Sequence, residues 1–247
     1  MPIVSTEAFV LRSYKLAEQD KIVVLFSKDF GKIRLVAKGA RRMKSRFGAS
    51  LEIFAHLRII FHEKENRELK VLDRAEILYS PFERQRQLRT NYHLSYFAEL
   101  IHEFFPDHEK NLSAFKILMN IEQAIQNRQN VDYLARYVEL QLLHSQGILS
   151  SVAFCSHCGR AFESLQERRY LGSGSEIYCR RCRTPESIAL SAAVVLSIHR
   201  FEKGSAEWAA TLRGRTLDDL ESLNHLLIQR FLGKELQSYK LRKEFRL

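Results

Sequence analysis

The chain has 247 residues, 45% of them apolar and 28% charged, and its 39 Lys and Arg side chains exceed its 29 Asp and Glu side chains to give a formal charge of +10. This composition is typical of a folded globular protein and excludes a disordered or collagen-like chain. No apolar run approaches the roughly 18 residues of a membrane span, and residues 1–16 lack the unbroken apolar block of a secretion signal, so we expect a cytoplasmic protein without membrane contact.

The first 80 residues have the sequence pattern of β-strands. Runs rich in β-formers, or alternating between apolar and polar residues, predict strands over residues 6–11, 21–26, 32–37, 51–62 and 69–79. Polar segments at residues 28–31 and 63–68 predict turns. Because no helix intervenes, the pattern favours a small closed barrel over a layout in which strands and helices alternate.

The positive charge is concentrated in this first part, where residues 1–80 hold 16 basic and 10 acidic side chains. Residues 31–51 contain no acidic side chain and seven basic ones, which are Lys32, Arg34, Lys38, Arg41, Arg42, Lys44 and Arg46. Alternation predicts that Lys32 and Arg34 lie on the exposed face of the third strand, and most of the others belong to a loop over residues 39–48. Solvated surfaces normally mix both signs, so the run favours a polyanion-binding site over a solvated loop without a partner.

Beyond residue 81 the apolar residues follow helical spacing. Helices are predicted over residues 82–105, 112–125, 131–144, 189–201 and 217–231. Gly147 and Gly233 fit the position just after a helix, and Thr216 is a candidate N-cap for the last one. The aromatic residues in these segments are interpreted as helix–helix core.

Residues 150–185 break the helical pattern and hold all the cysteines, Cys155, Cys158, Cys179 and Cys182. Two C-x2-C pairs about 20 residues apart are typical of one structural Zn²⁺ held by four thiolates. Gly159 follows the first pair, where such a turn often needs a positive φ. We therefore expect an α+β protein with two domains, a strand domain over residues 1–80 and a helical domain over residues 81–247 that carries the zinc element.

Other uses of these cysteines fit less well. The missing secretion signal disfavours disulfides, and a thioredoxin-type redox motif uses one C-x-x-C rather than two matched pairs. A deaminase-type zinc site needs His-x-Glu, which the sequence lacks. His157 is an alternative ligand. The six arginines around the cysteines either stabilise the thiolates or reach phosphate.

The sequence offers no catalytic constellation. It lacks a phosphate-binding loop, a His-Glu-x-x-His motif and a Gly-x-Ser-x-Gly motif. Its acidic residues are scattered, without the cluster of a two-metal nuclease. We expect a protein that is not an enzyme.

The motifs taken together resemble one family. The matching segments are TEAFVLRSY at residues 6–14, GKI at 31–33, AKGARR at 37–42, RFG at 46–48, LEIF at 51–54, and NY…YFAEL at 91–100. They are similar to bacterial RecO, a recombination mediator and DNA-annealing family, and the AKGARR…RFG run is the most specific part. The resemblance covers essentially the whole chain. The zinc cysteines are present in only some members.

The resemblance implies an OB-fold followed by a helical domain with a zinc-binding element. It also implies binding of single- and double-stranded DNA, annealing of complementary strands, and recombinase loading in recombinational repair, within the bacterial cytoplasm and near the nucleoid. The implied partners are RecR and the C-terminal tail of single-strand-binding protein. No nucleotide hydrolysis is implied.

The basic residues fit such a role, because phosphate neutralisation holds two strands together without reading their sequence. Phe47, Tyr14 and Phe30 are candidates for base stacking, with core or turn packing as the simpler interpretation. Two rival functions remain. One is an RNA-binding module, since barrels and zinc elements also serve RNA, and the other is a zinc-stapled scaffold whose basic loop docks an acidic protein tail.

Overall fold

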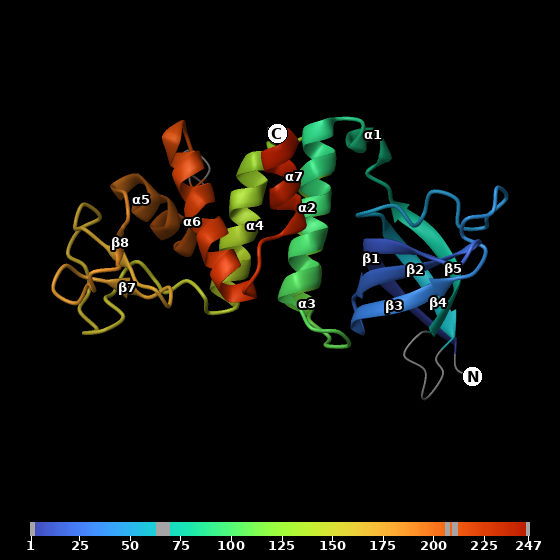
Figure 1. The fold of residues 1–247 in the computed structure, drawn as a ribbon, viewed down its shortest axis with the longest axis horizontal. Helices are drawn as coiled ribbons and strands as arrows, with labels where there is room; N and C mark the ends of the chain where they lie inside the picture. The colour runs from blue at the N-terminus through green and yellow to red at the C-terminus, as the bar shows by residue number, and fades with distance from the viewer. Residues whose placement is uncertain (1–2, 63–69, 206–207, 209–211, 246–247) are drawn as a thin grey trace. The chain divides into compact units, whose positions relative to one another are not determined.

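A computed structural model describes residues 3–62, 70–205, 208 and 212–245 of the chain, and the expected turn at residues 63–68 lies outside them (Figure 1). Backbone contacts divide the chain into two compact units. The first unit consists of Met1–Val131 together with Leu236–Leu247, and the second consists of Asp132–Glu235.

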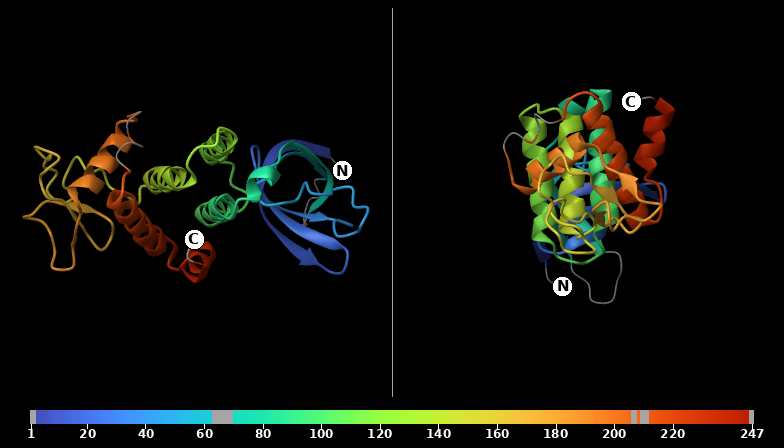
Figure 2. Two further views of the ribbon diagram at one scale, coloured as in Figure 1. Left: turned by 90° about the horizontal axis from the view of Figure 1, so that it is seen from above. Right: turned by 90° about the vertical axis from the view of Figure 1, so that its left-hand side faces the viewer.

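Five strands form a closed barrel in the first unit, and they are β1 (Ile3–Leu16), β2 (Asp20–Ser27), β3 (Gly31–Ala37), β4 (His56–His62) and β5 (Lys70–Tyr79). The barrel closes in the order β1-β2-β3-β5-β4, with β4 pairing back to β1. The β3–β5 pair is parallel and the other neighbours are antiparallel. Figure 2 shows the strands as a ring. This is the strand order of an OB-fold, so the expected α+β fold class is confirmed.

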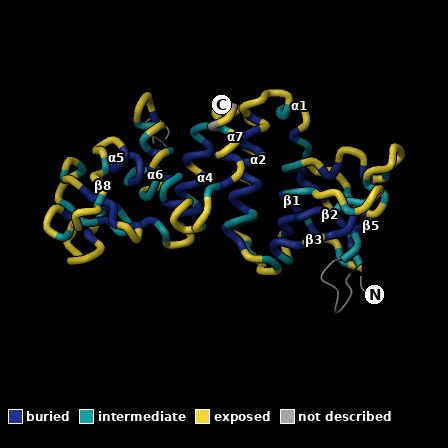
Figure 3. The backbone as a smooth tube through the Cα atoms, in the orientation of Figure 1, coloured by how far each residue is buried: buried dark blue, intermediate teal, exposed yellow. Residues whose placement is uncertain are grey.

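The barrel interior is built by the alternation that the sequence shows. Ile33, Leu35 and Ala37 of β3 are each at most 2% exposed and belong to one apolar cluster with residues from β1, β2, β4 and β5. Among the barrel strands β2 and β3 are mainly buried, whereas β5 is mostly intermediate or exposed. In Figure 3 exposed stretches lie in the segment between β3 and β4. Burial on one side of each strand fixes the register, because a slip by one residue would turn the apolar side chains outward.

Two strands differ in extent from the sequence prediction. The first was expected over residues 6–11, but β1 spans Ile3–Leu16. The fourth strand was expected from residue 51, but β4 begins at His56. Phe54 has a φ of 66°, a left-handed conformation that no β-strand contains. Its N–H donates to the Val10 carbonyl at 2.8 Å, and the Val10 N–H donates to Ala55 at 3.0 Å. The segment therefore bonds to the middle of β1, at Val10, before it enters the sheet as β4.

Four helices complete the first unit, and they are α1 (Phe82–Gln85), α2 (Leu88–Phe104), α3 (Leu112–Gln126) and α7 (Gln237–Phe245). The single helix predicted over residues 82–105 is in fact two, because Gln87 adopts an extended conformation between them. Phe105 is also extended, with a ψ of 135°, as expected for a residue that precedes proline.

Aromatic contacts join α2, α3 and the adjoining chain to the barrel. The rings of Phe26 and Phe105 lie 5.7 Å apart, and those of Phe9 and Phe115 lie 5.6 Å apart. The buried His56 Nδ1 lies 2.9 Å from a carboxylate oxygen of Glu122 on α3. The helical aromatics interpreted as core are therefore partly core between helix and barrel.

Glu99 on α2 binds the end of the chain to its beginning. Its carboxylate accepts the N–H groups of Gln237 and Ser238, both at 2.9 Å, at the start of α7. It also accepts a hydrogen bond from Arg12 of β1 at 3.3 Å. A buried carboxylate at a helix N-terminus satisfies unpaired N–H groups and complements the helix dipole. Tyr96 and Tyr239 pack edge to face beside it, with ring centroids 5.8 Å apart.

Replacing Gly31 with Ala is expected to destabilise the first unit strongly. Gly31 has a φ of +63°, and a Cβ built there would lie 1.9 Å from the Glu109 carbonyl oxygen. The backbone conformation alone costs about 1 kcal/mol, and the clash forces β3 away from the segment before α3, so we expect at least about 3 kcal/mol in total. Urea unfolding measures the difference.

The control for this variant is Gly48→Ala. Gly48 also has a positive φ, +48°, but no atom lies within 4 Å of the added Cβ. It is expected to cost about 1 kcal/mol, from conformation alone. Equal losses of unfolding free energy in the two variants would show that the close approach of the Glu109 carbonyl to Gly31 does not contribute to stability.

The second unit contains α4 (Val131–Ser145, whose first residue belongs to the first unit), α5 (Ala192–Glu202) and α6 (Arg215–Leu232), and a small sheet of β6 (Tyr170–Leu171), β7 (Ile177–Tyr178) and β8 (Ile188–Ala189).

A buried polar network joins two helices of the second unit. Glu139, fully buried on α4, accepts hydrogen bonds from Arg136 at 2.5 Å and from Asn224 of α6 at 2.9 Å. Arg136 also pairs with Glu221 at 2.9 Å. Such a network fixes the pairing of the helices because each buried charge requires its partner.

At the helix ends of this unit, the predictions for Gly147 and Gly233 are confirmed, whereas the predicted N-cap of α6 and the predicted start of α5 are wrong. Gly147 and Gly233 have φ values of 65° and 66°, and Gly233 caps α6 in the left-handed conformation. Thr216 is not the N-cap, because α6 already begins at Arg215 and Gly214 precedes it. The expected start of α5 at residue 189 is also wrong. Ile188 and Ala189 pair with β6, and Ser191 caps the helix by accepting from the Val194 N–H at 3.3 Å.

Candidate nucleic-acid interface and metal centre

The loop between β3 and β4 is held against the turn between β1 and β2. Asp20 accepts the Gly39 N–H at 2.7 Å, and Gln19 accepts from Arg42 at 2.6 Å. Arg41 donates to the carbonyl oxygens of Ala17 and Glu18, at 3.1 and 2.8 Å. Arg41 and Arg42 thus give hydrogen bonds to neutral groups and keep their charge uncompensated by these contacts.

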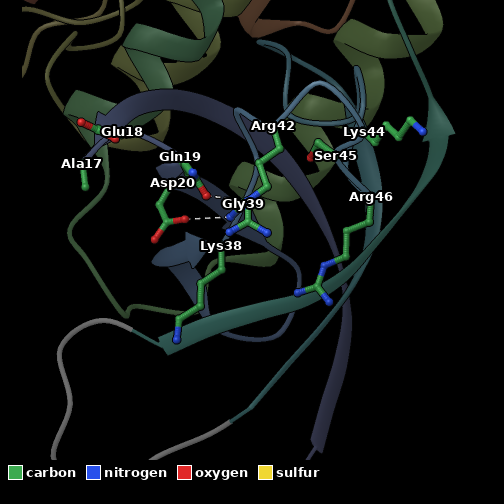
Figure 4. A pocket seen from close by; sticks show the side chains of 10 residues that line it. All are labelled: Ala17, Glu18, Gln19, Asp20, Lys38, Gly39, Arg42, Lys44, Ser45 and Arg46. Carbon is green, nitrogen blue, oxygen red and sulfur yellow. Dashed lines mark hydrogen bonds between the residues drawn. The ribbon is translucent and has the colours of Figure 1, made fainter.

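A groove lies between this loop and that turn. Its lining residues are Ala17, Glu18, Gln19, Asp20, Lys38, Gly39, Arg42, Lys44, Ser45 and Arg46. In Figure 4 the side chains of Lys38, Arg42 and Arg46 extend toward the lower part of the view, whereas that of Lys44 extends away from them. Lys38 and Lys44 are exposed and make no side-chain hydrogen bond or ion pair with the described residues. Four of the seven predicted residues therefore line one groove.

Arg46 is anchored more firmly than the other loop cations. Its guanidinium lies 3.6 Å from Asp73 and 3.4 Å from the Leu72 carbonyl of β5. It also lies 5.0 Å above the ring of Phe47. Phe47 itself is 3% exposed and belongs to the barrel core, so its simpler interpretation as core packing is confirmed and it is not a candidate for base stacking. Tyr14, 46% exposed, remains available to a ligand.

The two predicted residues of β3 lie apart from this groove and contact Asp107. The Lys32 ammonium is 3.1 Å from Asp107, and Arg34 is 2.8 Å from its other oxygen. Lys32 is 7% exposed and donates to the His102 carbonyl at 2.6 Å, so the expectation of an exposed Lys32 is wrong. Arg34 is exposed as expected.

Asp107 was not anticipated from the sequence, because it lies in the connection between α2 and α3. Burial alone would raise the pKa of Asp107, but the hydrogen bond from Lys32 and the charges of Lys32 and Arg34 outweigh it and lower the pKa. The carboxylate therefore stays ionised and compensates two of the seven basic residues. Arg74 of β5, a highly exposed cation beside Arg46, was also missed since it stands alone in a strand pattern.

His102 makes this region sensitive to pH. Burial and the nearby charges of Lys32 and Arg12 lower the pKa of His102 from 6.5 to about 4, against smaller opposing effects of Glu103 and Asp107. Between these two values the unfolded chain binds a proton that the folded protein does not, so stability is expected to fall as the pH drops through this window. His102→Gln should reduce that fall. Urea unfolding at several pH values measures it, and identical pH profiles would contradict the assignment.

The four cysteines converge in the second unit. The Sγ atoms of Cys155, Cys158, Cys179 and Cys182 all lie within 4.8 Å of one another. Gly159 has the expected positive φ, 70°, and its N–H donates to the Cys155 carbonyl at 2.9 Å. The Cys179 N–H donates to the Cys155 sulfur at 3.3 Å. His157 is exposed and is not a member of the cluster, so four sulfur atoms form the donor set.

The cysteine thiols have shifted pKa values, and their close approach favours a bound cation. Burial would raise the pKa of Cys155, but backbone N–H groups of Cys158, Cys179 and His157 outweigh it and lower the pKa to about 6. Burial and the neighbouring sulfur atoms raise the pKa of Cys182 to about 12. Four thiolates this close repel one another unless a cation compensates them. The donor set therefore fits a thiophilic metal ion.

Comparison with known proteins then identifies the chain. A family model described as "Recombination protein O N terminal" matches residues 1–81, and a model described as "Recombination protein O C terminal" matches residues 85–240. The chain belongs to the RecO family.

Individual RecO relatives agree with this. DNA repair protein RecO of Koribacter versatilis is 33% identical over 67% of this chain and 66% of the relative. The RecO of Geobacter metallireducens is 32% identical over 77% and 78% of the two chains. That of Syntrophus aciditrophicus is 25% identical over 97% and 95%. The similarity thus extends over both units.

RecO membership supports a role in DNA repair and recombination. The RecO family is one of DNA repair and recombination proteins and not an enzyme family, in agreement with the missing catalytic motifs. No helix among the described residues is long and apolar enough to cross a membrane. The RecO resemblance seen in the sequence is confirmed.

Proposed function

We propose that this chain binds single- and double-stranded DNA through the basic groove of its barrel and anneals complementary strands. The observation that carries the proposal is a set of cations on an OB-fold that form no ion pair with the described residues. Lys38, Arg42 and Lys44 line the groove, and Arg41 belongs to the same loop. OB-folds bind oligonucleotides along the β2–β3 face and the adjoining loops, and the groove lies next to the β1–β2 turn. In this proposal residues 1–80 form the DNA-binding domain, and residues 81–247 form the helical domain.

Annealing follows from charge rather than from base contacts. Two complementary strands repel one another through their phosphates, and cations that neutralise phosphates lower that repulsion. A site that contacts only backbone leaves the base edges free to pair. Arg46 adds charge within the groove and Arg34 adds charge on β3, although each also has a carboxylate partner, Asp73 and Asp107. Lys32, buried against Asp107 and the His102 carbonyl, contributes to the field without contacting the strand.

We propose Zn²⁺ as the metal of the cysteine cluster. Four sulfur donors in two C-x2-C pairs are the preferred set for a structural zinc ion, with no open position for catalysis. When bound, the ion holds the four thiolates together and stabilises the surrounding short segments. Cys155 and Cys179 are the buried ligands, and Cys158 is the exposed one.

We further propose that the protein acts in the bacterial cytoplasm, associated with the nucleoid, and that it helps load the recombinase. RecR and the C-terminal tail of single-strand-binding protein are the proposed partners. These proposals rest on RecO membership. The positive formal charge of the chain is compatible with an acidic tail as a ligand.

A strand-annealing assay tests the proposal. Complementary DNA strands are mixed with the protein, first bare, then coated with single-strand-binding protein, and then coated with its tail-deleted form. We expect faster annealing with bare and coated strands and a loss of this effect with the tail-deleted form. Unchanged annealing rates in all three conditions would contradict the function. Stronger binding to single-stranded RNA than to DNA at equal salt would favour the RNA-binding alternative.

A further inference from the structure

The cysteine element, residues 150–190, contains six arginines, and two of them have structural partners. Arg160 pairs with Glu167, and Arg169, 2% exposed, donates to the Val152 carbonyl at 2.6 Å and lies 4.3 Å from the ring centroid of Phe162. These two arginines hold the element together. The arginines that remain are Arg168, Arg180, Arg181 and Arg183.

These four arginines differ from Arg160 and Arg169 in their exposure and in their ion pairs. All four are exposed. Within the described part of the chain none of the four forms an ion pair, whereas Glu167 is already occupied by Arg160. The Arg183 guanidinium lies 4.9 Å over the ring of Tyr170 on β6. The element thus presents four positive charges to solvent without a carboxylate to compensate them.

The backbone that carries these arginines is fixed by the cysteine turns. Arg180 and Arg181 stand between two ligands of the cluster, and the N–H groups of Cys182 and Arg183 both donate to the Cys179 carbonyl at 3.1 Å. Tyr170 on β6 pairs with Tyr178 on β7. Arg183 follows the turn between Cys179 and Cys182 directly, so hydrogen-bonded backbone carries three of the four arginines.

Guanidinium groups on a rigid backbone suit phosphate. Arginine donates a planar pair of N–H groups to two phosphate oxygens, and little backbone entropy is lost when its anchor is already ordered. Cys155 and Cys179 are each 1% exposed, whereas the four arginines and Cys158 are exposed. The four arginines are therefore accessible to an approaching phosphodiester strand.

We propose that Arg168, Arg180, Arg181 and Arg183 form a second contact for the sugar-phosphate backbone of DNA, distinct from the groove of the barrel. This inference rests on the proposed DNA-binding function. With one backbone contact in each unit, a single chain holds two segments of DNA, which is what pairing of two strands requires.

The test compares two double variants of the full-length protein. Arg180→Ala/Arg181→Ala removes two charges from the cysteine element, and Arg213→Ala/Arg215→Ala removes two exposed charges elsewhere in the second unit. Affinity for a labelled single-stranded oligothymidylate is measured over a range of salt concentrations. Each phosphate contact contributes about 0.7 to the slope of log affinity against log salt, so the first variant should lose about 1.4 in slope and about 25-fold in affinity at about 0.1 M salt. The control should change little.

Bound metal is measured in both variants. If Arg180→Ala/Arg181→Ala loses its metal, the single variant Arg168→Ala tests the inference instead, because Arg168 lies outside both cysteine pairs. We expect this variant to lose about 5-fold in affinity for the oligothymidylate. Wild-type binding by the cysteine-element variants, together with weaker binding by variants of the barrel groove, would overturn this inference and leave the proposed function intact. Wild-type binding by both sets would overturn both.

Two further outcomes would also overturn the inference. Equal losses in the two double variants would show that net charge alone matters. Unchanged DNA binding by Arg180→Ala/Arg181→Ala, combined with loss of binding to polyglutamate, would assign the four arginines to an acidic protein partner instead.

Discussion

Replacing Lys38, Arg42 and Lys44 together with alanine is expected to weaken binding to single-stranded DNA about 100-fold at about 0.1 M salt. The three side chains line the groove between the β3–β4 loop and the β1–β2 turn, and none of them forms an ion pair with a carboxylate among the described residues. Each should neutralise about one phosphate, so the slope of log affinity against log salt should become shallower by about 2. Fluorescence anisotropy over a salt series measures both quantities.

The fold should survive these three changes. The only hydrogen bond that the described structure shows from these side chains runs from Arg42 to the neutral Gln19 side chain, and a single exposed hydrogen bond contributes little to stability. The matched control is Arg86→Ala/Lys110→Ala/Lys116→Ala, which removes the same charge from exposed positions outside the barrel. Equal losses of affinity in both triple variants would refute a localised site.

Cys155→Ser is expected to abolish metal binding and unfold the cysteine element. Cys155 is 1% exposed and accepts the Cys179 N–H, so its sulfur holds both halves of the cluster together. Structural Zn²⁺ contributes about 10 kcal/mol or more of binding free energy to folding, so the loss should exceed the effect of any surface variant. Elemental analysis should find one zinc per chain in the wild type and none in the variant.

His157→Ala serves as the control for the metal prediction. His157 lies between two of the cysteines but is exposed and outside the cluster, so it should retain one zinc and wild-type stability. Metal loss in this variant would instead make histidine a ligand. A wild-type protein that is fully folded without metal, with its thiols free to react, would contradict a structural metal altogether.

The sequence predicted the features that depend on local pattern. The alternation in the third strand places Ile33, Leu35 and Ala37 on the face opposite Lys32 and Arg34, and that face is the core; the spacing of the cysteines identified the cluster. Both are periodic or short-range signals, which a single sequence records directly. Gly147, Gly159 and Gly233 were found for the same reason, because each satisfies a local backbone requirement.

The errors involve contacts between segments that are distant in the chain. Lys32 was expected to be exposed because alternation shows only that it points away from the barrel interior. It does not show that the chain around His102 and Asp107 covers that side of β3. Phe54 likewise enters a left-handed conformation because its N–H group bonds to Val10 of β1. No local pattern records a partner of this kind.

The division of the chain also depends on distant contacts. The two family models meet between residues 81 and 85, where strands give way to helices. The compact units instead divide near residue 131 and again near residue 236. Helices α2 and α3 pack on the barrel through Phe105 and Phe115, and α7 returns to α2 through Glu99.

The position of Glu99 has a consequence for the order in which contacts form while the chain is being synthesised. The second unit is inserted within the chain of the first, and the N–H groups that Glu99 accepts belong to Gln237 and Ser238. During synthesis from the N-terminus, the barrel strands and α2 emerge long before α7 exists. Until then the Glu99 carboxylate has Arg12 as a partner but lacks these two donors. The first unit can therefore bind its last helix, α7, only after the whole second unit has been synthesised.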